Sequence, residues 1–281
     1  MNEVTRFKNF TQHPCLSLKT VKHRIRETWR HHTTNINTQP IFVFGNQKSG
    51  TSAIAALLGE MTGRSYTIDI FCHFGDIESQ LLGGQASLNE FIQQTRFYFS
   101  RDIVKDPSLT FFYDELKERF PNAERIFVLR DPRQNIRSIL NRLGLPGNLN
   151  DLSPEKWHQI AITHPAWLPV LDGKLAGHQG KSYIETLALR CQKTFQIYLQ
   201  NRAEVIPIYY EAFKADKSGA IQALAQQLGL PIRNDITALK DIQFQPKGNA
   251  TVPLDIFFGP ENLSLIETIC GETMMAVGYS L

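Results

Sequence analysis

Cysteine is scarce in this chain of 281 residues. Its four cysteines lie far apart, at Cys15, Cys72, Cys191 and Cys270. No C-x-x-C pair and no secretory context accompanies them, so the sequence favours reduced thiols over disulfides or a zinc site. The adjacent histidines 31 and 32 have no third ligand at metal spacing. The sequence therefore predicts no metal centre.

Long apolar runs and an excess of one charge are also lacking. No stretch approaches the roughly 20 apolar residues of a membrane-spanning helix, and the basic N-terminus has no apolar core of a signal peptide. Thirty basic residues against 27 acidic ones leave a net charge of +3, which is too balanced for general nucleic-acid binding. We expect a cytoplasmic protein without a membrane span or a nucleic-acid partner.

Nothing in the composition divides the chain. It contains no Ser/Gly linker, charge block, internal repeat or low-complexity tract, and α/β domains of this length are common. We expect a single domain over residues 1–281.

The most informative segment is residues 41–52, where a short apolar strand meets a glycine-bounded loop that runs directly into a helix. Apolar residues spaced by three, four and seven from Ile54 to Met61 give that helix one buried face. The N–H groups and dipole of a helix N-terminus favour an anion, and Thr51 and Ser52 can add hydroxyl donors. The segment predicts a phosphate cradle, residues 45–52.

The position of the lysine separates this cradle from the nucleoside-triphosphate loop, which reads G-x-x-x-x-G-K-[ST]. Gly45 and Gly50 have the required separation, but Thr51 follows the second glycine and the lysine is Lys48. From within the loop its ammonium would lie beside the terminal group of a bound nucleotide. There it can stabilise a leaving oxygen without a metal ion.

The cradle resembles the 5′-phosphosulfate loop of sulfotransferases that use 3′-phosphoadenosine 5′-phosphosulfate (PAPS). Residues 125–140 support this resemblance, because they contain a strand ending at Arg130 and a helix with Asp131 as its cap and Pro132 in its first turn. In the family's 3′-phosphate motif, an arginine at the strand end and a serine eight residues later hold that phosphate. The matching residues here are Arg130 and Ser138, and a guanidinium can grip a phosphate as a bidentate fork.

Three weaker similarities extend the resemblance over most of the chain. Residues 103–107 look like a family strand that ends in Lys-Asp-Pro, and residues 208–213 are similar to a Tyr-Glu segment at the end of a later strand. Residues 245–249, which include Lys247 and Gly248, resemble the loop that closes on the 3′-phosphate side.

The resemblance implies a P-loop-like α/β fold, in which a parallel sheet is covered by helices on both faces. It also implies PAPS as co-substrate, its desulfated form PAP as product, and no metal. The residues expected to bind the co-substrate are Gln47, Lys48, Ser49, Gly50, Thr51, Ser52, Arg130, Ser138, Lys247 and Gly248.

The pattern of apolar residues and breakers predicts the order of elements. Strands are expected at 41–45, 102–105, 125–130 and 204–210, and helices at 17–32, 51–61, 91–99, after 107 to about 120, 132–143, 182–201, 218–228 and from about 261. Prolines interrupt the stretch from Gly144 to Gly180, which contains Trp157 and Trp167. We expect this stretch to be a lid on the acceptor side.

The expected reaction moves a sulfuryl group to an acceptor hydroxyl or amine, with Lys48 stabilising the departing phosphate. Asp106 and His73 are the leading candidates for the general base, followed by Asp69 and Asp76. A carboxylate that caps the next helix explains Asp106 equally well. The acceptor could be a carbohydrate, lipid, peptide or small molecule.

Two other functions remain open from the residues alone. A P-loop kinase for a small molecule predicts a lysine after Gly50 as well as a magnesium-binding hydroxyl, and only the hydroxyl is present. A non-catalytic nucleotide-binding module would not require Lys48 together with Arg130 and Ser138.

Overall fold

The computed structural model describes residues 33–173, 177–240 and 251–281. The helix predicted at 17–32 and the loop containing Lys247 and Gly248 lie outside these ranges. In chain order, with η for 3-10 helices, the elements are β1 (Ile41–Gly45), α3 (Thr51–Thr62), β2 (Tyr66–Ile68), η2 (Phe71–His73), α4 (Ile77–Leu82), α5 (Leu88–Gln94), α6 (Arg96–Phe99), β3 (Ile103–Lys105), η3 (Pro107–Phe112), α7 (Tyr113–Arg119), β4 (Glu124–Leu129), α8 (Pro132–Leu143), α9 (Pro154–Thr163), η4 (Pro165–Trp167), α10 (Leu168–Asp172), α11 (Tyr183–Asn201), β5 (Ile206–Tyr209), α12 (Tyr210–Ala215), α13 (Lys217–Gln227) and α14 (Leu254–Ala276).

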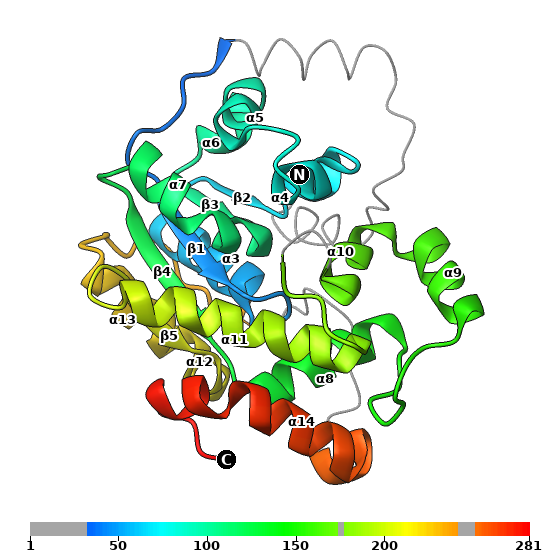
Figure 1. Ribbon diagram of the computed structural model, residues 1–281. Coiled ribbons are helices and arrows are strands. Elements are labelled where there is room, and N and C mark those ends of the chain that lie inside the picture. Colours follow the sequence, from blue (N-terminus) through cyan, green and yellow to red (C-terminus); the bar gives the residue numbers. More distant parts are fainter. Residues whose placement is uncertain (1–32, 174–176, 241–250) are drawn as a thin grey trace.

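Five parallel strands form one sheet in the order β2-β3-β1-β4-β5. The central strand β1 pairs with β3 from Ile41 opposite Ile103, and with β4 from Ile41 opposite Glu124. Helices lie on both sides of the strands in Figure 1. The predicted α/β fold with a parallel sheet is confirmed.

The alternation of side chains along β1 gives the sheet two apolar faces. Phe42 and Phe44 belong to a large buried cluster that includes residues of α7, α8 and α11, whereas Ile41 and Val43 belong to a second cluster with α3 and α13. Every residue of β1 is buried. A strand buried on both faces reads as a continuous apolar run, which is why its bounds were predictable.

The structure corrects several expected element bounds. The edge strand β2 was not predicted, because three residues are too few to show a period of two. The helix expected at 91–99 is divided at Thr95 into α5 and α6. Strand β5 ends at Tyr209 and α12 begins at Tyr210. Helix α14 begins before residue 261 but contains a break at Gly259, whose φ is +69°, immediately before Pro260.

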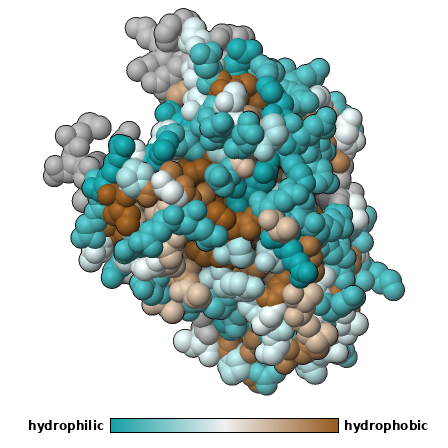
Figure 2. Space-filling model, turned by 90° about the vertical axis from the view of Figure 1, so that its left-hand side faces the viewer, coloured by the Kyte–Doolittle hydropathy of each residue, from teal (hydrophilic) through white to brown (hydrophobic). Residues whose placement is uncertain are grey.

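The segment from Gly144 to Gly180 is less irregular than expected, since it contains α9, η4 and α10. Ile160 and Leu171 are buried within it, and Trp157 and Trp167 pack against the large cluster. Figure 2 shows another face of the molecule, where hydrophilic residues cover most of the surface and apolar residues gather across its middle. Within the described ranges, no helix combines the length and apolar character needed to cross a membrane.

Candidate active site

The cradle joins the carboxyl end of β1 to the N-terminus of α3, and its two glycines have backbone conformations that other residues rarely adopt. The φ angles of Gly45 and Gly50 are +136° and +97°. A Cβ at Gly50 would lie 2.5 Å from the Tyr210 ring, and one at Gly45 would lie 2.8 Å from the Val128 carbonyl oxygen. Close packing of β4 and α12 therefore requires glycine at both positions.

Lys48 has a left-handed backbone conformation with a φ of +64°, which costs about 1–2 kcal/mol for a residue with a Cβ. The carbonyls on either side of its backbone are held from other elements. Asn135 of α8 donates to the Gln47 carbonyl at 2.8 Å, and the Arg130 guanidinium donates to the Lys48 carbonyl. Such strain persists only where neighbouring contacts fix it, and it is frequent at functional sites.

The Lys48 ammonium lies in a positive environment. Burial and then the charges of Arg142, Arg130 and Lys105 together lower its pKa to about 8, while Asp69 acts in the opposite direction. Clustered cations destabilise one another unless an anion joins them. The cradle can therefore accept a strongly anionic group.

A second lysine supports the cradle from β3. The Lys105 side chain is buried and donates from Nζ to Ser52 Oγ at 2.8 Å, and it also pairs with the half-exposed Asp69 carboxylate. Lys105 of β3 thus positions the Ser52 side chain at the start of α3. Asp69, at the end of β2, also has a positive φ of +56°.

Arg130 follows β4 and lies against the cradle. Its guanidinium is 4.2 Å from the centre of the Tyr210 ring, and its buried Nε has no hydrogen-bond partner. Burial lowers its pKa. Ser138 is half-buried on α8, the helix that begins two residues after Arg130. The structure therefore brings Arg130 to the cradle and places Ser138 on the adjoining helix.

Glu211 connects the segment after Arg130 to the end of the described chain. Its carboxylate accepts hydrogen bonds from the Asp131 N–H at 3.2 Å and from the Tyr279 hydroxyl at 2.8 Å. Asp131 in turn accepts from the Arg133 N–H at 2.8 Å as the cap of α8. These contacts hold the N-terminus of α8 beside the cradle.

The two leading base candidates have different environments. Both oxygens of the buried Asp106 carboxyl accept backbone hydrogen bonds, from Phe71 and Ser108 at 3.0 Å each, and Asp106 caps η3. Burial, followed by the charges of Asp69 and Glu78, raises its pKa to about 7. His73 is exposed and stacks on Tyr98 with 5.6 Å between ring centres. The contacts of Asp106 are the ones expected if it serves as a carboxylate that caps the helix after it.

Glu78 on α4 was not among the sequence candidates, yet its environment suits acid–base chemistry. Desolvation raises the pKa of its carboxyl, which accepts a hydrogen bond from the Ser108 hydroxyl. Ser108 Oγ also accepts from Gln47 Nε2 of the cradle at 3.1 Å. The available sequence signal was only that Glu78 belongs to the segment after the cradle helix, and that segment contains several other polar residues.

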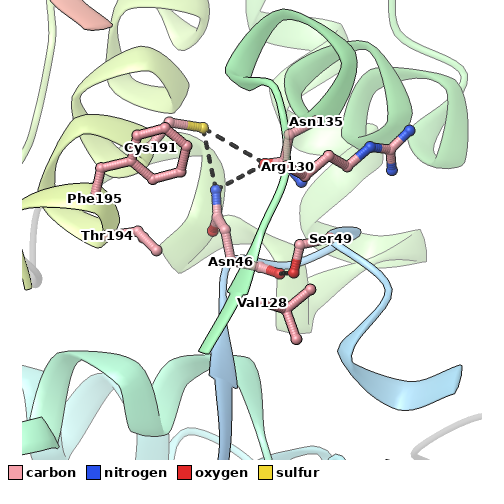
Figure 3. Close-up of a pocket in the computed structure, with 8 residues that line it drawn as sticks. All are labelled: Asn46, Ser49, Val128, Arg130, Asn135, Cys191, Thr194 and Phe195. Atoms are coloured by element: carbon pink, nitrogen blue, oxygen red, sulfur yellow. Dashed lines mark hydrogen bonds between the residues drawn. The ribbon is translucent and has the colours of Figure 1, made fainter. Parts of the chain in front are cut away.

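Figure 3 shows a small cavity next to the cradle, lined by Asn46, Ser49, Val128, Arg130, Asn135, Cys191, Thr194 and Phe195. The Asn46 side-chain amide donates to Asn135 Oδ1 at 2.9 Å and to Cys191 Sγ at 3.2 Å. Burial raises the pKa of the Cys191 thiol to about 12, so the thiol stays protonated. These contacts connect the cradle to α8 and α11.

Residues 71–235, more than half of the chain, match the profile described as the Sulfotransferase family. The structure is similar to sulfotransferase STF9 from Mycobacterium avium, with a TM-score of 0.55 and 14% identity over 93% of this chain and 82% of that one. Lower similarity is found with mouse sulfotransferase SULT7A1 complexed with PAP (TM-score 0.49, 15% identity, 89% of each chain). A sulfotransferase from Alicyclobacillus acidocaldarius gives a TM-score of 0.47 and 13% identity over 86% of this chain and 97% of that one. No curated protein sequence matches the chain.

The described part of the molecule has the α/β sulfotransferase fold. The chain belongs to the sulfotransferase family, which confirms the family and the enzyme class predicted from the two phosphate motifs. The family match begins at Phe71, after the cradle. The roles of individual cradle residues therefore rest on their geometry and remain proposals.

Proposed function

We propose that this sulfotransferase moves the sulfuryl group of PAPS to a hydroxyl or amine of an acceptor. The observation that carries the proposal is the position of Lys48 inside the glycine-bounded cradle, where burial and three neighbouring cations lower its pKa. A lysine in this position can stabilise charge that develops on a leaving phosphate. A kinase loop has its lysine after the second glycine, and the family match does not favour a kinase or a non-catalytic module.

The cradle and Arg130 have the chemistry needed for the two ends of PAPS. We propose that residues 47–52 receive the 5′-phosphosulfate through backbone N–H groups and the hydroxyls of Thr51 and Ser52. Arg130 and Ser138 receive the 3′-phosphate, for which the unpartnered buried Nε of Arg130 is suited. Lys247 and Gly248 remain proposed contacts on the 3′-phosphate side.

The transfer requires one bond to form and one to break. The acceptor oxygen or nitrogen forms a bond to sulfur while the bond between sulfur and the bridging 5′-phosphate oxygen breaks. The bonding electron pair stays on that phosphate, beside the Lys48 ammonium, and PAP leaves. The acceptor proton passes to a general base, so that neutral acceptors can react near pH 7.

We propose Glu78 as that base, in place of Asp106 and His73. Its raised pKa brings a carboxylate closer to the proton affinity that a base needs, and its Ser108 contact leads to Gln47 in the cradle. Asp106 is proposed to cap η3, because its two oxygens already accept backbone hydrogen bonds. His73 is proposed to belong to the exposed rim of the acceptor side.

Calorimetry with PAP and AMP tests the proposed co-substrate. Wild-type protein should bind PAP more tightly than AMP, because only PAP has the 3′-phosphate that Arg130 would bind. The Arg130→Ala variant should lose this preference, and the control Arg202→Ala, which replaces an exposed arginine after α11, should keep it. Equal affinity of the wild type for PAP and AMP would overturn the assignment.

The acceptor can be sought separately. The protein is incubated with PAPS and a panel of carbohydrates, lipids, peptides and small hydroxyl or amine compounds, and mass spectrometry detects the added sulfate. A product that forms with PAPS and is missing when the Lys48→Ala variant replaces the wild type identifies an enzymatic acceptor.

A further inference from the structure

The cradle contacts a buried arginine that comes from a distant part of the sequence. Arg190 lies in the middle of α11, is 0% exposed, and directs its guanidinium to two cradle side chains. Its Nε donates to Asn46 Oδ1 at 3.1 Å and to Gln47 Oε1 at 3.0 Å, and a terminal nitrogen donates to Gln47 Oε1 at 2.8 Å. The ring of Phe111 packs against the guanidinium at 4.4 Å.

A guanidinium in this position is costly as a space-filling group. Burying a charge is unfavourable unless hydrogen bonds and an opposite charge compensate it. The hydrogen-bond acceptors of Arg190 in the described residues are neutral, and the charges of Glu78 and Asp106 favour its charged form without a direct ion pair. Burial lowers its pKa to about 10, so it keeps its charge at neutral pH. An aliphatic side chain would fill the same volume but would leave the side-chain oxygens of Asn46 and Gln47 without this donor, so the guanidinium has a role in holding the cradle.

Arg190 determines the orientation of Gln47. The Gln47 side-chain oxygen accepts two bonds from the guanidinium, while its nitrogen donates to Ser108 at 3.1 Å. The backbone of Gln47 is held at the same time, since its carbonyl accepts from Asn135 and its N–H donates to Asn46 Oδ1 at 3.0 Å. The residue immediately before the strained Lys48 is therefore fixed at its carbonyl, its N–H and its side chain.

We propose that Arg190 is a positioning residue of the cradle, which holds Asn46 and Gln47 so that the Lys48 ammonium is directed at the transferred group. It acts through Gln47 and does not contact substrate. The role in catalysis rests on the proposed sulfuryl transfer, whereas the effect on the conformation of the cradle does not. Helix α11 is a rigid support for this role, because Tyr183, Leu187 and Phe195 anchor it in the large apolar cluster.

Hydrogen–deuterium exchange of Arg190→Lys tests the proposal without an acceptor. Lysine keeps the charge but cannot form the planar fork, so the amides of residues 46–50 should exchange about tenfold faster or more, as expected for lost hydrogen bonds to a charged group. Arg125→Lys is the matched control, since Arg125 is also buried but donates to the carbonyls of Phe120 and Ala123. In the Arg125→Lys variant, the amides of residues 46–50 should exchange at the wild-type rate.

Gln47→Ala removes the contact with Arg190 from the cradle side, so it tests the same contact without changing the apolar core. It should produce similar cradle exchange, and the double variant Arg190→Lys, Gln47→Ala should exchange no faster than the faster single variant, because both changes break the same contact. In all three variants the affinity for PAP should fall about tenfold.

Three results would overturn the positioning role. They are wild-type cradle exchange in Arg190→Lys, equal acceleration in Arg125→Lys, and independent, multiplying effects in the double variant. A failure of the proposed function has a different signature. The wild-type protein would not prefer PAP over AMP, yet the exchange of the cradle would still depend on Arg190.

Discussion

The proposed co-substrate and acceptor sides of the site are built differently. On the co-substrate side, β1 and β4 lead into α3 and α8, two helices of 12 residues each, and most of these residues are buried. The proposed acceptor side comprises residues 65–100 and 144–180, where the helices have three to ten residues and the exposed fraction is higher.

This difference follows from what each side has to recognise. The phosphate groups of a nucleotide can be bound by backbone N–H groups, so the co-substrate side depends on chain geometry, glycines and a few cations. An acceptor is recognised through side chains on adaptable segments. Changes in the cradle should therefore act on PAP binding as well as on turnover, whereas changes on the proposed acceptor side should act on turnover alone.

The largest expected effect is a loss of turnover from a change on the proposed acceptor side. Glu78→Gln removes the proposed base and should lower turnover about a hundredfold to ten-thousandfold, with PAP affinity within a few-fold of the wild type. Since a base must be deprotonated, wild-type turnover should fall as the pH decreases through the raised pKa of Glu78. The measurement is a pH profile of sulfate transfer, with calorimetry of PAP in parallel.

Asp106→Asn and His73→Ala are the comparison variants for this prediction. Asp106→Asn should lower the free energy of unfolding by about 1 kcal/mol or more, because an amide cannot accept both backbone bonds, and His73→Ala should behave like the wild type. If Glu78→Gln retains wild-type turnover while Asp106→Asn or His73→Ala loses it with PAP affinity intact, the base belongs to that residue instead.

The comparison also shows what the sequence could predict. The bounds of β1, α3 and α8 could be predicted because local signals agree there: an apolar run, glycines with a fixed separation, and Asp131 followed by Pro132. Lys48 and Arg130 were accessible to sequence analysis for the same reason. Their motifs are contiguous.

Contacts between distant segments could not be predicted from the sequence. Arg190 lies 143 residues from Gln47, and Tyr210, which follows the edge strand β5, limits the space at Gly50 after the central strand β1. Neither contact has a local pattern, since each depends on the packing of whole elements. Glu78, the proposed base, was missed because it lies in a six-residue helix that follows a three-residue strand. Such short elements have weak periodicity.

A pair of glycine variants tests whether PAP affinity depends on the cradle and not on the proposed acceptor side. Gly50→Ala introduces a Cβ 2.5 Å from the Tyr210 ring at a φ of +97°, so the cradle must distort and PAP affinity should fall about tenfold or more. Gly84→Ala, after α4, is the matched control, because Gly84 also has a positive φ of +69° but no atom within 4 Å of the added Cβ. It should lose some stability and keep PAP affinity.

Calorimetry with PAP measures both glycine variants, and thermal unfolding shows how much of each effect is a loss of fold. The prediction is contradicted if Gly84→Ala weakens PAP binding as much as Gly50→Ala at comparable stability. In that case the acceptor side also forms part of the nucleotide site, and the division of the two sides fails.

The smallest expected effect is the pH dependence of PAP binding. Burial and neighbouring cations lower the pKa of Lys48 to about 8, so its ammonium loses its proton as the pH rises through this value. Bound phosphate favours the protonated form, and affinity should therefore be highest below pH 8 and fall above it by up to about tenfold per pH unit. Calorimetry between pH 7 and 9, in buffers of different ionisation enthalpy, should also detect proton uptake on binding above pH 8.

Lys48→Met should bind PAP more weakly at pH 7 and should remove most of this dependence. The Cys191 thiol and Arg190, whose pKa values are about 12 and about 10, titrate above this range. Lys193→Met, which replaces an exposed lysine on α11, should keep the wild-type profile. If Lys48→Met retains the same slope above pH 8, another group must titrate there, and the Lys48 ammonium would then not be the charge that the co-substrate side offers to the 5′-phosphate.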